Sequence, residues 1–183
     1  TMKMMKKLMA VALAGVMALT LLAGCGSMIE EKEIVACLSD AYKAWTGKSI
    51  SMTAASSNEA GKAAKTLKEY QAEHPGETIE SMLAYNGTET TAPEAALAAA
   101  LKAENETDRI IVSYAKLEEY QSKFCSERKN MMIAQKMWDN GRTVYADLYL
   151  AAAEEATVSL TVEKFDDDNY VIAVIRLKNP AKG

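Results

Sequence analysis

Aromatic residues make up only 7% of this chain of 183 residues, which also contains a single histidine, three prolines and three cysteines. One histidine excludes a metal site built from several histidines. The 21 Lys and Arg do not exceed the 25 Asp and Glu, so the basic surplus typical of a nucleic-acid-binding protein is missing. Three prolines and nine glycines exclude a collagen-like chain, whereas 49% apolar residues are typical of a globular core.

The first 24 residues have the pattern of an export signal. Three lysines lie within the first seven positions, and residues 8–22 form an uninterrupted run of apolar and small side chains. Such a run is short for a membrane-spanning helix, which needs about 20 apolar residues. We therefore predict a removable signal peptide over residues 1–24.

The signal ends in Leu22-Ala23-Gly24-Cys25, which resembles the lipobox of bacterial lipoproteins. The resemblance implies that the Cys25 thiol is joined to diacylglycerol and that a peptidase cuts before this residue. Two or three acyl chains, at about 0.8 kcal/mol per buried methylene, then hold the protein at the bilayer. The alternatives are an ordinary secretory signal or an anchor helix with a chance cysteine.

The expected location is therefore the extracytoplasmic side of a cell membrane. No aspartate follows Cys25 directly, so the inner-membrane retention signal of Gram-negative lipoproteins is missing. Either a Gram-positive cell surface or a Gram-negative outer membrane fits. Because the leader carries three of the basic residues and none of the acidic ones, the mature chain has a net charge of −7, and anionic lipid heads would repel its surface.

Beyond the leader we predict a lipidated tether over residues 25–29 and a single α+β domain over 30–183. Apolar residues recur at helical spacing from Ile34 to Trp45, and Gly47 ends that helix. A capping box at residues 56–59 is expected to start a second helix. Further helices are expected over 77–85 and 91–103, and in a long helix with one face formed by Leu117, Tyr120, Phe124, Met131, Ala134 and Trp138, ending at Asn140-Gly141.

The C-terminal third contains the clearest strand signals. Val158, Leu160 and Val162 alternate with polar residues, as in a half-buried strand, and residues 170–177 are apolar on both faces. A strand with two apolar faces needs cover on both sides, so we expect it at the centre of the sheet.

The predicted fold is a mostly helical N-terminal two-thirds packed on a small antiparallel sheet that ends in a C-terminal β-hairpin. The alternation around Ile50 and Met52 allows one further, brief strand. Residues 109–115 and 142–156 are compatible with either strand or helix.

Two cysteines remain after lipidation, Cys37 and Cys125. Outside the cytoplasm they can oxidise to a disulfide. Such a bond would reduce the entropy of the unfolded chain and so raise the free energy of unfolding by about 4 kcal/mol. The alternative is two buried free thiols, since each lies near the apolar side of a predicted helix.

Other candidate chemistry is sparse, and no cofactor or metal site is predicted. His74 precedes Pro75-Gly76, as solvated loop residues do, and would serve a catalytic cysteine only if it lay beside Cys37 or Cys125. The three aspartates of 166–168 lack the distal ligands of a calcium loop and favour a hairpin turn. Three methionines could line an adaptable groove, but their spacing favours core packing: Met131, Met132 and Met137.

A second resemblance concerns the domain itself. Gly76-Glu77-Thr78-Ile79, the helix start at Ala92–Ala96 and the predicted C-terminal hairpin resemble the CAP superfamily of secreted α-β-α sandwich proteins. Thr78 stands where that family has asparagine, and Ser126–Asn130 stands where it has a His-Arg-x-Asn segment. The resemblance implies a three-layer fold with a cleft.

Three functions are compatible with these features. Because the sequence presents no convergent nucleophile, base and oxyanion donors, the leading hypothesis is a non-catalytic, membrane-anchored lipoprotein that binds an envelope component, a solute or a partner protein. The second is a structural or assembly role in an envelope complex, through the alanine-rich helices. The third is an enzyme, either CAP-like or a cysteine hydrolase.

Overall fold

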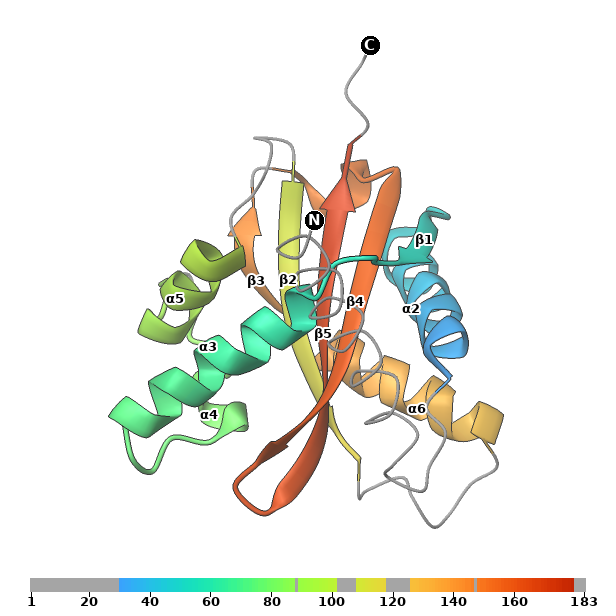
Figure 1. Ribbon diagram of the computed structural model, residues 1–183. Helices are drawn as coiled ribbons and strands as arrows, with labels where there is room; N and C mark the ends of the chain where they lie inside the picture. The colour runs from blue at the N-terminus through green and yellow to red at the C-terminus, as the bar shows by residue number, and fades with distance from the viewer. Residues whose placement is uncertain (1–29, 88, 102–107, 118–125, 147, 180–183) are drawn as a thin grey trace, which may run out of the picture.

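The computed structural model describes five ranges of the chain: residues 30–87, 89–101, 108–117, 126–146 and 148–179. They contain five α-helices, a short 3-10 helix and a sheet of five strands (Figure 1). The predicted leader, Cys25 and Cys125 lie outside the described residues.

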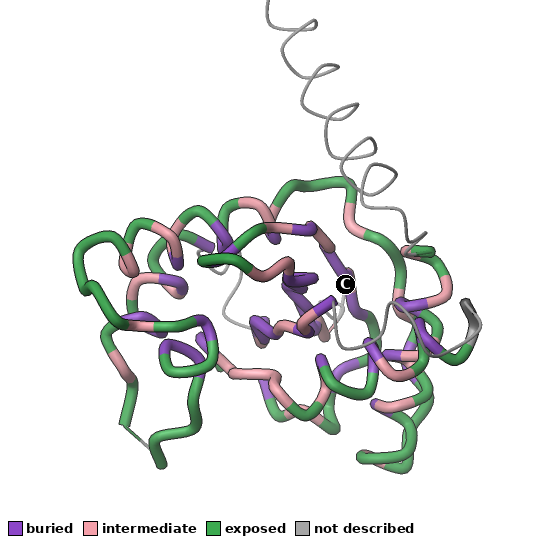
Figure 2. The backbone as a smooth tube through the Cα atoms, turned by 90° about the horizontal axis from the view of Figure 1, so that it is seen from below, coloured by how far each residue is buried: buried purple, intermediate pink, exposed green. Residues whose placement is uncertain are grey.

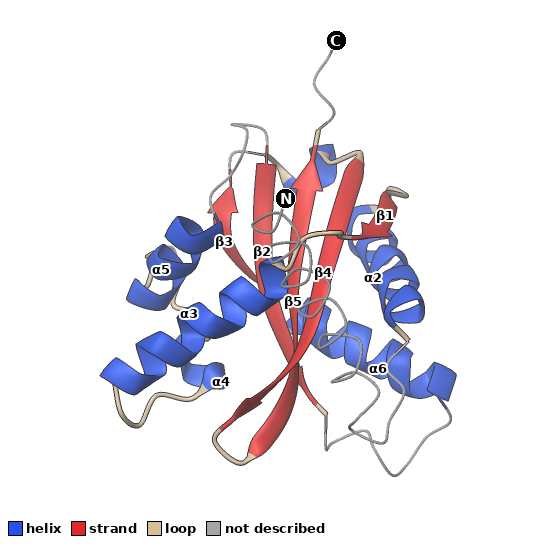
Figure 3. Ribbon diagram, in the orientation of Figure 1, coloured by secondary structure: helices blue, strands red, loops and turns tan. Residues whose placement is uncertain are grey.

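The five strands follow the order β1-β4-β5-β2-β3 across the sheet (Figure 3). The central strand is the one that is apolar on both faces, as predicted, and it forms a hairpin with its predecessor. The C-terminal β-hairpin is therefore confirmed. The bounds are β1 (Ser51–Ala54), β2 (Asp108–Lys116), β3 (Arg142–Ala146), β4 (Glu155–Phe165) and β5 (Asp168–Lys178).

The prediction of an antiparallel sheet is wrong at one edge, since β1 pairs with β4 in parallel and the sheet is mixed. The register places Ser51 opposite Glu155 and Ala54 opposite Val158. A parallel neighbour needs a long crossover instead of a hairpin. Here four α-helices, two strands and the 3-10 helix of the described residues separate the paired segments along the chain. Apolar alternation has the same period in either orientation, so the sequence pattern carries no information on this point.

Helices cover both faces of the sheet, so the domain has three layers, with the sheet in the middle (Figure 1). One face is covered by α2 (Glu31–Thr46) and α6 (Ser126–Asp139), and the other by α3 (Glu59–Glu73), α4 (Ile79–Met82) and α5 (Ala92–Leu101). Strand β5 contributes alternate residues to the two resulting cores, such as Val171 to the α2–α6 side and Ile172 to the other. Figure 2 shows the buried segments of the backbone gathered in the interior and the exposed ones mainly on the outer turns.

The start of α3 differs from the predicted capping box. Asn58 is the N-cap, and its side-chain oxygen accepts from the Gly61 N–H at 3.1 Å. Buried Ser159 of β4 accepts from the Ala60 N–H at 3.0 Å and so satisfies a second free donor of the first turn. Glu59, expected to close the box, bonds Arg176 of β5 instead.

The structure assigns both segments whose sequences were compatible with either strand or helix. Residues 109–115 belong to β2, and 142–156 divide into β3, the 3-10 helix η1 (Leu150–Ala152) and the start of β4. Leu117 was predicted on the face of the long helix, which is wrong, because it follows β2 directly and is fully buried beneath α2 and α6. Tyr120 and Phe124 lie outside the described residues.

Within the described part of the chain, none of the helices combines the length and apolarity that a membrane crossing requires.

Tyr170 links β5 to α4 and makes the stability of the fold sensitive to alkaline pH. Its hydroxyl donates to the Glu80 carboxylate at 2.7 Å. Burial, and then this bond to Glu80, raises the pKa of the Tyr170 phenol. An unfolded tyrosine titrates near about pH 10, so the stability contributed by the neutral phenol is complete below that pH and is lost above it.

We expect Tyr170→Phe to lose about 1–2 kcal/mol of unfolding free energy at pH 7. The difference in unfolding free energy between wild type and variant should shrink above about pH 10, because only the wild type loses stability as unfolded Tyr170 ionises. Urea unfolding at pH 7, 9, 10.5 and 11 measures it, with Tyr149→Phe as control, since Tyr149 is 86% exposed. A deficit that stays constant with pH would contradict the prediction.

Candidate ligand pocket

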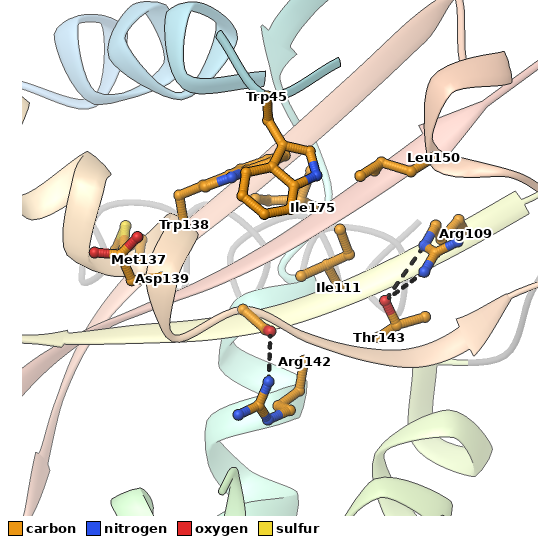
Figure 4. A pocket seen from close by; sticks show the side chains of 11 residues that line it. Trp45, Arg109, Ile111, Met137, Trp138, Asp139, Arg142, Thr143, Leu150 and Ile175 are labelled. Carbon is orange, nitrogen blue, oxygen red and sulfur yellow. Dashed lines mark hydrogen bonds between the residues drawn. The ribbon is translucent and has the colours of Figure 1, made fainter. Parts of the chain in front are cut away.

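A pocket of about 390 Å³ opens on the α2–α6 face of the sheet. It lies between the C-terminal ends of the two helices, η1 and strands β2 and β3 (Figure 4). Such a volume falls in the range of small-molecule sites. Its lining is apolar except for two arginines, an aspartate and a threonine: Trp45, Arg109, Ile111, Met137, Trp138, Asp139, Gly141, Arg142, Thr143, Leu150 and Ile175.

Both tryptophans of the chain line this pocket. Trp138, half-buried near the end of α6, meets the ring of Tyr42 edge to face with centroids 6.1 Å apart. The Tyr42 hydroxyl in turn donates to the Leu150 carbonyl at 2.6 Å, which holds η1 against α2. One pocket wall is therefore fixed by packing and hydrogen bonding.

Trp45 corrects the predicted inner face of α2. Helical spacing placed it with the core residues, but its side chain is 73% exposed. Trp45 belongs to the last turn of α2, just before Gly47, whose positive φ of 74° ends the helix. There the indole borders the pocket instead of the core.

Gly141 allows the floor of the pocket to form. The sequence predicted it as a helix cap, yet the glycines with positive φ in the described residues are Gly47, Gly76 and Gly87. A Cβ on Gly141 would lie 3.1 Å from Ile111 Cγ2 and 3.3 Å from the Trp138 carbonyl oxygen. A side chain at position 141 would therefore have to displace its neighbours by a few tenths of an ångström, which glycine avoids.

Arg109 reaches the pocket from β2 and is held in place by neutral acceptors. Its Nε and Nη2 donate to Thr143 Oγ1 at 3.3 and 3.1 Å (Figure 4). Its Nη1 donates to the Leu148 carbonyl at 3.2 Å. Burial lowers the pKa of the Arg109 guanidinium. Arginine nevertheless stays protonated at neutral pH, because its unperturbed pKa exceeds about 12.

Arg142 supplies a second guanidinium at the same site. Its Nε donates to the Leu83 carbonyl at 2.7 Å, and Nη1 donates to the Gly141 carbonyl at 3.3 Å. The group also lies over the ring of Tyr85, with Cζ 5.1 Å from the ring centroid. These contacts, all to neutral groups, orient Arg142 from the α4–α5 side.

Two smaller hollows border the same arginine. One of about 300 Å³ is lined by Arg109, Ala146, Leu148 and Tyr149, and one of about 280 Å³ includes Arg109, Arg142 and Tyr85. The exposed large apolar side chains of the described residues are Trp45, Tyr85, Met131 and Tyr149. All but Met131 therefore line hollows that share Arg109. A cluster of exposed aromatics of this kind is typical of an interaction site.

The predicted cysteine pair stays a prediction. Cys37 is half-buried on α2, packs against the α2–α6 core and forms no disulfide with another described residue. Burial raises the pKa of this thiol, and the nearby Asp40 and Glu33 raise it further. Cys125, like Cys25, lies outside the described residues.

His74 does not meet Cys37. It is exposed at the end of α3, stacked on Tyr70 with ring centroids 4.1 Å apart, and its Nδ1 lies 3.0 Å from the Tyr70 carbonyl. Tyr70 packs against the α3–α5 core, whereas Cys37 packs on the opposite face of the sheet. Cys37 and His74 therefore do not form a catalytic cysteine–histidine pair.

The predicted aspartate turn is confirmed for Asp166, at a φ of 51°, and Asp167, which join β4 to β5, whereas Asp168 is already the first residue of β5. Asp168 forms an ion pair with Lys116 of β2. No group of three or more potential acidic, histidine or cysteine ligands occurs among the described residues.

The prediction that the three methionines pack in the core is confirmed for Met137 and in part for Met132, but it is wrong for Met131, which is 54% exposed.

The two motifs that carried the CAP resemblance form ordinary helix starts. Thr78 and Ser81 build the capping box of α4, and the Glu94 carboxylate accepts from the Thr91 N–H at 2.9 Å before α5. Comparison of the sequence and structure with known protein families, curated proteins and solved structures finds no match. The resemblance therefore rests on these motifs alone.

Sequence reasoning missed the pocket arginines. Arg109 stands at the start of an apolar run, and Arg142 follows a helix-ending Asn-Gly; neither position has a motif around it. The one available signal was the scarcity of tryptophan, since both copies fall near the ends of predicted helices.

Proposed function

We propose that the chain is a lipid-anchored, extracytoplasmic binding protein that holds the flat, apolar part of a small ligand in the Trp45–Trp138 pocket. The observation that carries the proposal is the convergence of exposed aromatic side chains on hollows that share Arg109. Exposed indole and phenol rings cost free energy in water, and they recover it when a ligand covers them.

The position of the pocket suits a tethered receptor. Trp45 lies about 21 Å along α2 from Glu31, at 1.5 Å per residue, so the site is at the end of α2 opposite to the first described residues. A ligand could therefore enter the pocket from the aqueous side while Cys25 holds the domain at the membrane. The lipobox resemblance supports this part of the proposal.

Tryptophan fluorescence gives a direct test, because both tryptophans of the chain border the pocket. We expect the neutral probe 3-phenylpropanamide to shift the emission to shorter wavelength and to saturate with a millimolar or tighter Kd. Trp45→Ala should weaken binding about tenfold, equal to about 1.4 kcal/mol, with Trp138 left as reporter.

Met131→Ala is the matched control, since Met131 is also an exposed apolar residue but lines none of these hollows. It should leave the Kd unchanged. Emission that stays unshifted up to about 10 mM probe, or equal weakening by both substitutions, would contradict the proposed site.

A further inference from the structure

Two guanidiniums border the pocket, and neither forms an ion pair with a carboxylate of the described residues. Arg109 bonds the Thr143 hydroxyl and the Leu148 carbonyl, and Arg142 bonds two carbonyls. The single acidic residue that lines the pocket is Asp139. The site is thus locally cationic in a chain whose net charge is −4.

Arg176 provides a contrast within the same fold, because this guanidinium is paired with carboxylates. Its side chain lies between Glu59 and Asp108, and both carboxylates accept its hydrogen bonds. Burial by itself would lower the pKa of Arg176, but those bonds raise it, whereas the pKa of Arg109 is lowered by burial without such compensation. Arg109 is therefore a partly desolvated cation that lacks the anion with which buried charges are normally paired.

Two carboxylates, those of Glu89 and Glu94, line the hollow on the α5 side of β3 together with Arg109 and Arg142. Glu89 is exposed, and Glu94 Oε2 accepts from the Thr91 N–H as the cap of α5. The pocket on the α2–α6 face holds no such acid besides Asp139. An anionic group entering there would meet Arg109 without displacing an internal ion pair.

We infer that the pocket selects small aromatic carboxylates, with the carboxylate on Arg109 and the ring against Trp45 and Trp138. This inference rests on the proposed binding function and names the class of ligand. A guanidinium offers parallel N–H donors that match the two oxygens of a carboxylate. The two ends of the ligand thus make different interactions: the ring makes apolar contacts, and the carboxylate accepts charge-assisted hydrogen bonds.

The test compares 3-phenylpropionate with 3-phenylpropanamide, which differ in charge but little in shape. Calorimetric titration at pH 7.5 should show the carboxylate binding at least tenfold more tightly than the amide. Arg109→Gln should reduce that preference to near onefold while leaving the amide Kd within about twofold. Acetate, which lacks the ring, should bind at least tenfold more weakly than 3-phenylpropionate.

Arg128→Gln is the matched charge control, because Arg128 is exposed and lies about 15 Å along α6 from Trp138. It should keep the full carboxylate preference. If Arg109→Gln does not fold, Arg109→Lys retains the charge without the planar fork, and its preference should fall between those of the wild type and onefold.

The outcomes separate the two proposals. If neither probe binds the wild type, both the proposed function and the ligand class are overturned. If the wild type binds both probes equally, the pocket stands and the carboxylate inference is overturned. A preference that survives Arg109→Gln would overturn the assignment of the anion to Arg109.

Discussion

Replacing Arg176 with methionine is expected to lower the free energy of unfolding by about 3–5 kcal/mol. The Arg176 side chain is 4% exposed, and its guanidinium donates to Asp108 at 2.9 Å, to Glu59 at 3.2 Å and to the Leu101 carbonyl at 3.0 Å. Removing the cation leaves the carboxylates of Glu59, at the start of α3, and of Asp108 without this partner, and their side chains are only 13% and 1% exposed. Charge buried without a partner is among the costliest defects that a fold can carry.

Urea unfolding followed by circular dichroism measures this loss. Replacing the whole triad, with Arg176→Met, Glu59→Leu and Asp108→Leu combined, should recover most of it, because no uncompensated charge remains. Lys65→Met is the matched control, since the Lys65–Glu69 pair is 77% and 64% exposed and its loss should cost under about 0.5 kcal/mol. A cost below about 1 kcal/mol for Arg176→Met would contradict the prediction.

The other large effect is expected at the anchor. Cys25→Ala should abolish the incorporation of fatty acid, because alanine offers no thiol for thioether formation. When residues 1–24 are also replaced by a cleavable secretory signal, the Cys25→Ala protein should move from the membrane to the soluble extracytoplasmic fraction. Without the two or more acyl chains, no strong membrane affinity remains, and the acidic surface is repelled by anionic lipid.

Cys37→Ala is the matched control for this experiment. Cys37 is half-buried within α2, and its thiol is kept protonated by burial and by Asp40 and Glu33, which raise its pKa. The variant should keep both the fatty-acid label and the membrane location. Fatty acid on the Cys25→Ala protein, or an intact mass that shows a wild type without lipid, would contradict the proposed anchor.

Much of the fold follows from local patterns. The alternation of Val158 and Val162, the two apolar faces of β5 and the three-and-four spacing in α2 predicted the right elements, because side-chain periodicity reports directly on which face is buried. The two segments left open were ambiguous for a physical reason. Strand β3 is short and half-exposed, so its apolar pattern is weak. The alanines in and around η1 favour helix by their intrinsic propensity where tertiary packing does not impose another conformation.

The errors share one cause, which is a tertiary contact that overrides a local preference. Glu59 has the sequence context of a capping box but instead neutralises Arg176, more than 100 positions away. Leu117 has helical spacing to the residues after it but fills the core at the end of β2. Trp45 has core spacing but lies beyond the last buried turn of its helix.

The candidate pocket was out of reach of any local pattern. Its walls come from Trp45, Arg109, Trp138 and Arg142, which are brought together by two helices and two adjacent strands. The isolation of Arg109 from carboxylates is a property of three-dimensional distance, and no spacing along the chain encodes it.

Taken alone, the amino-acid sequence determined the periodic elements, the central position of β5 and the expectation of a lipid anchor at Cys25, because each depends on residues near one another in the chain. Tertiary structure decided the parallel pairing of β1, the buried Arg176 triad and the cationic aromatic pocket. These depend on which distant residues meet, and side chains dozens of positions apart acquire a common environment only when the sheet and its two helical layers assemble.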